Sequence, residues 1–179
     1  ILKKLKDLMD KLFDVFQYDL NKISITPEKV NIFAFIEKLY HDSEQLMVGK
    51  NIKFTLQNKL SPHLTAIIDP LYIDKLMQNL ISNAIKFTPA SGKISLIAKQ
   101  ENSNLLFCIS DNGAGVPDQT KKTIFEKFTS NHVMENPGIG LGLYIARNIA
   151  ELHHGKIWVE NNPGGGAIFY VKIPRGKIK

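Results

Sequence analysis

The first twenty residues carry apolar side chains at helical spacing. Alternating steps of three and four residues separate them, which is the repeat of a helix that packs against a partner helix. These residues are Leu2, Leu5, Met9, Leu12 and Phe16. Packing of this helix on its own domain is the alternative, because only two to three heptads are visible. The polar stretch that follows, with Thr26-Pro27-Glu28 near its end, predicts a linker.

The rest of the chain alternates between helical and strand patterns. Helices are expected over about 30–47, from Pro70 through an apolar stripe that ends at Ile85, near 120–128 and over 141–154. Strands are expected over 52–57, 64–68, 93–100, 104–110, 156–161 and 167–173. Asp69 is expected to cap the helix that begins at Pro70. The layout predicts an α+β fold, a two-layer α/β sandwich whose mixed, mostly antiparallel sheet is covered on one face by helices.

Composition limits the class of protein. The 179-residue chain is 44% hydrophobic and 22% charged, which is typical of one folded domain. Its one cysteine, Cys108, is expected in the core and favours a reducing compartment. No run of about 18 apolar residues and no signal peptide are present, and the chain starts inside a helical pattern without Met. We therefore expect a piece of a longer protein, whose net charge of +6 suits an anionic ligand.

Three stretches carry candidate chemistry. Asn79, Asn83 and Lys86 share one helix face; amide oxygens suit Mg²⁺ and lysine suits phosphate, although such a trio also suits a solvent-facing surface. Asp111 ends a strand before Gly113 and Gly115, where a carboxylate and an accessible backbone fit an amine-bearing base; a hairpin turn is the alternative. Glycines then open the helix over 141–154, which is a ready anion site or a mere packing loop. They belong to the run Gly138-Ile139-Gly140-Leu141-Gly142-Leu143.

Taken in order, these stretches resemble the ATP-binding domain of sensor histidine kinases, in the GHKL superfamily with its Bergerat-type fold. The matching boxes are Asn79-x-x-x-Asn83-Ala84-x-Lys86-Phe87, Asp111-x-Gly113-x-Gly115, Phe125-x-x-Phe128 and Gly138-x-Gly140-Leu141-Gly142-Leu143. The resemblance covers residues 28–174. It implies the end of the second dimerisation and phosphoacceptor helix over 1–22, a linker over 23–29, the catalytic ATP-binding domain over 30–175 and a tail over 176–179.

The resemblance also implies roles for these residues. Asn83 would bind Mg²⁺ with Asn79 in support, Lys86 would lie near the phosphates of ATP, and Asp111 would read adenine in a pocket shaped by Gly113 and Gly115. Residues 116–137 would form a flexible ATP lid anchored by Phe125 and Phe128. The glycines at 138, 140 and 142, with Leu141 between them, would hold the phosphates. Two positions depart from the family pattern: residues 164–169 lack a hydroxyl, and Lys127 stands where arginine is common.

The implied reaction is phosphotransfer from ATP to a histidine, followed by relay to an aspartate of a response-regulator receiver domain. Superfamily ATPases that hydrolyse ATP have a glutamate at the position of Asn79, and an asparagine cannot take a proton from water. Hydrolysis is therefore disfavoured and transfer is favoured. The implied partners are the acceptor helix and a second copy in the parent protein, and nucleic acid is not expected. The implied location is cytoplasmic, as part of a membrane-anchored bacterial sensor.

The acceptor histidine is expected upstream of Ile1. Within the chain only His41-Asp42 begins like the acceptor motif, and no proline follows. His153 and His154 are expected to offset the dipole at the end of their helix. The alternatives are a hydrolytic ATPase, an inactive nucleotide-binding scaffold, and a basic nucleic-acid-binding module, for which no motif is present.

Overall fold

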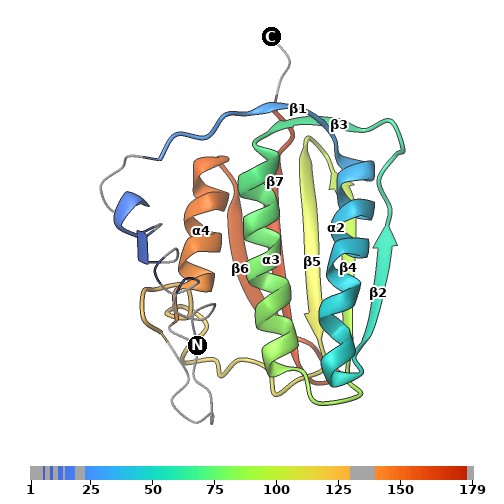
Figure 1. Ribbon diagram of the computed structural model, residues 1–179, viewed down its shortest axis with the longest axis vertical. Coiled ribbons are helices and arrows are strands. Elements are labelled where there is room, and N and C mark those ends of the chain that lie inside the picture. Colours follow the sequence, from blue (N-terminus) through green and yellow to red (C-terminus); the bar gives the residue numbers. More distant parts are fainter. Residues whose placement is uncertain are drawn as a thin grey trace.

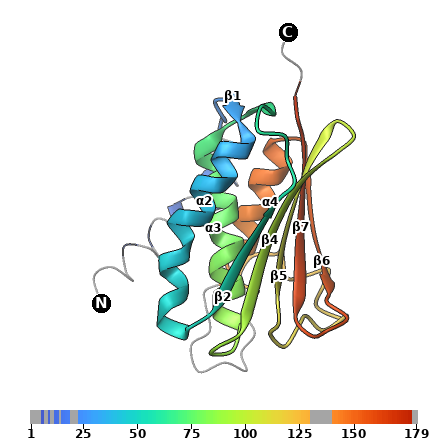
Figure 2. The same ribbon diagram turned by 90° about the vertical axis from the view of Figure 1, so that its right-hand side faces the viewer.

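The computed structural model describes residues 23–129 and 140–176, together with residues 6, 9, 12, 13 and 15–18. Three helices lie side by side on one face of a five-stranded sheet (Figure 1). Seen from the side, the helices and the sheet form two layers (Figure 2). The predicted α+β two-layer sandwich is therefore confirmed.

The helix layer consists of α2 (Ile32–Met47), α3 (Pro70–Phe87) and α4 (Gly142–Leu152), and the 3₁₀ turn η1 (Val48–Lys50) follows α2. The sheet runs in the order β2 (Lys53–Asn58), β4 (Lys93–Glu101), β5 (Asn104–Asp111), β7 (Ala167–Pro174) and β6 (Lys156–Asn161). Only the β2–β4 pair of this sheet is parallel. The sheet is thus mixed and mostly antiparallel, as predicted.

The start of the domain differs from the prediction. Glu28–Asn31 forms the strand β1, which pairs antiparallel with β3 (Thr65–Ile68) and brings Val30 opposite Ala66. The sequence pattern predicts a linker up to residue 29 and a helix from about residue 30. The helix α2 starts at Ile32 instead, because the Asn31 side chain caps it by accepting a hydrogen bond from Ala34 N at 3.0 Å.

The core lies between the two layers and explains why α3 is central. Its apolar stripe is buried from Ile73 to Ala84, and its last member, Ile85, is half-buried. Alternate residues of β4 and β7 beneath it are buried as well. The buried members of the stripe are Ile73, Leu76, Met77, Leu80, Ile81 and Ala84. Cys108 of β5 is also buried, as expected, and burial raises the pKa of its thiol.

Positions 9–18 that the structure describes are helical and pack partly on the domain. Val15 and Tyr18 are buried, and Leu12 packs against the core. Met9, Phe13 and Phe16 remain more than 60% exposed, at 62%, 63% and 64%. The exposed stripe therefore contains two of the predicted seam residues and Phe13 in place of Leu12, while Leu2 and Leu5 lie outside the described residues. No helix among the described residues has the length and apolar character needed to cross a bilayer.

Candidate nucleotide-binding site

A cavity of about 270 Å³ opens where α3 ends and α4 begins. These two ends lie together at one edge of the helix layer, beside the segment that leaves β5 (Figure 1). Eight of the residues singled out from the sequence line this cavity: Asn79, Asn83, Lys86, Asp111, Gly115, Gly140, Leu141 and Gly142. Gly138 lies outside the described residues.

Most of the apolar side chains that line the cavity were not predicted from the sequence. Phe87, Val116, Ile124, Leu143 and Phe169 line the cavity, together with Ser82, Pro117, Thr120, Thr129 and Ala167. These residues come from four parts of the chain: α3, the loop 115–129, α4 and β7. Phe87 and Leu143 belong to the boxes quoted above, and the others share no local motif. Residues so far apart in the sequence cannot be assigned to one cavity from local patterns, although the position of Phe87 directly after Lys86 was a usable signal.

The α3 wall presents amides and an ammonium to the cavity. Asn79 Nδ2 donates to Lys75 O at 2.9 Å, which leaves its Oδ1 directed towards Gly142, where a Cβ would lie 3.0 Å away. Asn83 lines the cavity one turn later, and its side chain makes no hydrogen bond to the described residues. Burial lowers the pKa of Lys86. This wall therefore offers amide oxygens and one cation.

Lys50 holds the end of α3 from behind this wall. Its Nζ donates to three carbonyl oxygens, those of Ile85 at 2.9 Å, Lys86 at 3.1 Å and Thr88 at 3.0 Å. Carbonyls at a helix C-terminus lack partners within the helix and carry partial negative charge, so an ammonium stabilises them. Lys50 thus fixes the backbone that carries Lys86 and Phe87.

Asp111 also lines the cavity. Its side chain is buried, and Oδ1 accepts hydrogen bonds from Gly113 N at 2.8 Å and Ala167 N at 3.2 Å. No described group donates to Oδ2, so this oxygen is available to a ligand that carries an amino group. Burial raises the pKa of Asp111, while its two backbone hydrogen bonds act in the opposite direction.

The two glycines after Asp111 have different roles. Gly115 has φ +76°, a left-handed conformation that favours glycine, and it lines the cavity. Gly113 does not line the cavity; a Cβ there would collide with Phe87 O. Gly113 therefore lets the loop approach the end of α3, and it shapes the pocket only indirectly.

The start of α4 contributes backbone to the cavity lining. Its N-cap is Leu141, and among the described residues no side chain accepts a hydrogen bond at this cap. Gly140, Leu141 and Gly142 all line the cavity. The first N–H groups of a helix and its dipole both favour an anion. The geometry at this end of the cavity suits a phosphate.

The segment between β5 and α4 corrects two expectations. The helix predicted near 120–128 is wrong: the segment forms successive turns, with Ile124 N donating to Thr120 O at 2.9 Å and Glu126 N to Thr123 O at 2.8 Å. Phe125 is buried and meets the Phe169 ring edge-on at 6.3 Å. Phe128, expected in the site, is 59% exposed and does not line the cavity, because its backbone turns at φ +59°.

Lys127 and the β6–β7 turn are the two places where the sequence departs from the family pattern. The Nζ of Lys127 is 5.1 Å from the centroid of the Tyr144 ring, and Lys127 is not a lining residue. Ala167, which follows the glycine run, contributes its backbone N–H to Asp111. The turn therefore supports Asp111 through its backbone, without a side-chain hydroxyl.

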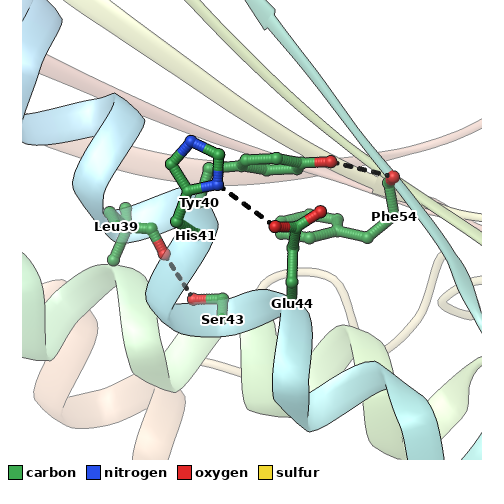
Figure 3. A network of polar contacts seen from close by, with 6 residues as sticks. All are labelled: Leu39, Tyr40, His41, Ser43, Glu44 and Phe54. Carbon is green, nitrogen blue, oxygen red and sulfur yellow. Dashed lines mark hydrogen bonds and ion pairs between the residues drawn. The ribbon is translucent and has the colours of Figure 1, made fainter.

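The four histidines that the structure describes, at positions 41, 63, 153 and 154, do not line the cavity. His41 is exposed on α2, where its Nδ1 is 3.2 Å from Glu44 Oε2 beside the Tyr40–Phe54 contact (Figure 3). The described residues that line the cavity come from α3, α4, β5, β7 and the loops 115–129 and 140–141, and none comes from α2. His41 is thus separated from the cavity by α3.

His153 contradicts the expectation that it offsets the helix dipole. It is buried, its Nε2 accepts a hydrogen bond from Asp69 N at 3.1 Å, and its Nδ1 lies 2.8 Å from Ile149 O. This arrangement requires the neutral ring with the proton on Nδ1. Burial lowers the pKa of His153, so the ring carries no charge to the helix end.

Comparison with known proteins agrees with this geometry. Residues 68–177 match the family described as histidine kinase-, DNA gyrase B- and HSP90-like ATPases. The chain is 34% identical over 170 residues, 93% of its length, to the sensor histidine kinase TmoS of Ectopseudomonas mendocina, of which it spans 17%.

Two solved histidine kinases share the fold. The catalytic domain of ThkA superposes with a TM-score of 0.75 at 28% identity, covering 84% of this chain and 97% of that domain. ThkA in complex with the response regulator TrrA gives 0.80 at 25% identity, covering 98% of this chain and 49% of that one. Full-length ShkA in complex with AMPPNP gives 0.79 at 25% identity, covering 96% and 36%. The chain therefore belongs to the family of histidine kinase-, DNA gyrase B- and HSP90-like ATPases.

Proposed function

We propose that this chain is the ATP-binding kinase domain of a two-component sensor histidine kinase. It would transfer the γ-phosphate of ATP to a histidine upstream of Ile1, for relay to an aspartate of a response regulator. The observation that carries the proposal is one cavity lined by a buried carboxylate, Asp111, by Asn79, Asn83 and Lys86, and by the start of α4. A base-reading group and an anion site thus face one ligand.

The residues present fit Mg·ATP. Asp111 Oδ2 would accept from the amino group of adenine, and the Asn83 amide oxygen, supported by Asn79, would bind Mg²⁺. Lys86 and the first N–H groups of α4 would hold the phosphates. The metal ion would supply positive charge to offset the charge that develops on the phosphoryl group. The AMPPNP in the ShkA complex supports a triphosphate as the ligand.

The same cavity argues for transfer over hydrolysis. Among the described lining residues, the only carboxylate is Asp111, and it is bound to backbone N–H groups at the base end. Near Asn79 and Asn83 the lining groups are amides, a hydroxyl and an ammonium, none of which suits a general base for water. This domain would therefore hold ATP for an external nucleophile.

Three partners belong to the proposal. The exposed stripe Met9, Phe13 and Phe16 is the face we assign to a second copy, within a helical bundle. The acceptor helix would belong to that bundle. A response-regulator receiver domain is proposed because ThkA forms a complex with TrrA. These partners imply a cytoplasmic location for the domain.

Calorimetry with ATP, with and without Mg²⁺, tests the proposal. Asp111→Asn should weaken binding in both conditions, because the charged carboxylate that accepts from the amino group of adenine is replaced by a neutral amide. Asn83→Ala should weaken only the Mg²⁺-dependent part. Absence of ATP binding at millimolar concentration would contradict the proposal, and ATP-dependent phosphate release by this chain alone would favour the hydrolytic ATPase.

A further inference from the structure

Asn161, the last residue of β6, pairs through its side chain with the backbone of Val116, 45 positions away. Val116 N donates to Asn161 Oδ1 at 2.8 Å, and Asn161 Nδ2 donates to Val116 O at 2.9 Å. The side-chain amide thus satisfies both backbone groups of one residue, as a neighbouring strand residue would do. Val116 lies in no strand, yet this pairing attaches it to the edge of the sheet.

This attachment lies next to the Asp111 end of the cavity. Val116 and Gly115 line the cavity with Asp111 and Ala167. A Cβ on Gly115 would lie 3.0 Å from Asn161 Oδ1 and 3.2 Å from Gly166 O, so the glycine leaves room for the pairing. The amides Asn79 and Asn83 and the ammonium of Lys86 come from a different element, α3. Asn161 therefore acts on the wall beside the buried carboxylate.

We infer that Asn161 is a positioning residue that holds Val116 against the nucleobase and so determines affinity for the adenosine part of the ligand. The inference rests on the proposed function. Without the Asn161 amide, the N–H and C=O of Val116 exchange their fixed partners for water. Gly115 and Val116 would then no longer be held at a fixed distance from Asp111. The adenine ring would therefore bind in a pocket of less complementary shape.

Adenosine and ATP are the two probes, each titrated by calorimetry into the full chain. Asn161→Ala should weaken binding of both by the same factor, about tenfold, since two hydrogen bonds that order the base wall are lost. Lys86→Ala should weaken ATP and leave adenosine unchanged. The melting temperature of Asn161→Ala should stay close to that of the wild type, because Asn161 is exposed at the end of an edge strand.

Asn31 provides a matched control. It also makes two hydrogen bonds to backbone, accepting from Ala34 N at 3.0 Å and donating to Pro62 O at 2.9 Å, and it does not line the cavity. Asn31→Ala should lower stability without changing either affinity. Asn161→Asp keeps the side-chain shape but sets an oxygen against Val116 O, so it should weaken adenosine at least as much as Asn161→Ala.

The outcomes separate this inference from the proposed function. If the wild type binds ATP but Asn161→Ala binds adenosine equally well, the inference is wrong and the proposed function stands. Weaker binding of ATP alone also overturns the inference, because Asn161 would then act on the phosphates. If the wild type binds neither probe, the proposed function itself fails.

Discussion

The two ends of α3 are both secured by a charged residue, yet they use it in different ways. At the N-terminal end, Asp69 Oδ1 accepts from Leu71 N at 3.1 Å and Tyr72 N at 3.2 Å, while Oδ2 accepts from Thr26 N at 2.7 Å. Both Asp69 and its neighbour His153 are buried. At the C-terminal end, Lys50 binds three carbonyls beside an open cavity.

This contrast separates stability from ligand binding along one helix. At the N-terminal end, the side chain and backbone of Asp69 form hydrogen bonds within the protein. These bonds connect the start of α3 to the segment that precedes β1, through Thr26, and to the end of α4, through His153. The C-terminal half keeps Asn83 and Lys86 turned to the cavity. Substitutions at the first end should therefore lower the free energy of unfolding, and those at the second should mainly lower affinity for nucleotide.

Asp69→Ala should have the largest effect on stability. It removes a helix cap and the acceptor of Thr26 N, and we expect a loss of about 2–4 kcal/mol in the free energy of unfolding. Chemical denaturation measures this loss. Asp69→Asn keeps a capping oxygen and should lose less. Nucleotide affinity of the folded Asp69→Ala protein should be unchanged, and a large loss of affinity would break the proposed separation.

Lys50→Met should lower both the free energy of unfolding and the affinity for ATP, because the hydrogen bonds of Lys50 hold the backbone of Lys86. Loss of three charge-assisted hydrogen bonds at a partly buried site should lower the free energy of unfolding by about 1–3 kcal/mol. ATP affinity should fall as well, since the end of α3 is released. Lys53→Met, on an exposed lysine of β2, is the matched control for charge removal. An unchanged ATP affinity in Lys50→Met would show that the cap serves stability alone.

His153 predicts how the N-terminal end responds to pH. Its pKa is lowered by burial, so the unfolded chain binds the proton more readily than the folded one. Stability should be constant above about pH 7 and fall as pH drops through about 6.5, by at most about 1.4 kcal/mol per pH unit.

Protonation of His153 would place an N–H on Nε2, facing the N–H of Asp69, so that the hydrogen bond between them would be lost. The Asp69 carboxylate favours the charged ring, and His154 opposes it. Denaturation curves at several pH values measure the slope. His153→Gln should flatten the curve, and His63→Gln, on an exposed loop, should not. A slope that persists in His153→Gln would assign the acid response to another group.

Asn83→Ala should change stability least, because it truncates a side chain that faces the cavity and has no hydrogen bond to the described residues. We expect a change in the free energy of unfolding within about 0.5 kcal/mol, measured by denaturation beside the Mg²⁺-dependent titration proposed above. A loss as large as that of Asp69→Ala would mean that Asn83 supports the fold.

Several elements were predictable because their signals are local. Asp69, Pro70 and the apolar spacing after them predicted the start of α3, and the side-chain cap confirms it. The bounds predicted for β4, β5, β6 and β7 agree with the structure to within one residue. The strand β1 was missed because the polar sequence Glu28–Asn31 is a strand only through pairing with β3, about 37 positions later. The proposed division of the chain at residues 22 and 29 stays a prediction.

The sequence by itself determined the chemical groups and their local spacing: amides on one face of α3, a carboxylate at the end of β5 and glycines at the start of α4. Tertiary structure decided which of these groups share a cavity, that His153 is neutral, that Phe128 points away and that Asn161 holds Val116. Hydrogen bonding and burial depend on distance in space, and spacing along the chain carries that information only within one helix, strand or turn.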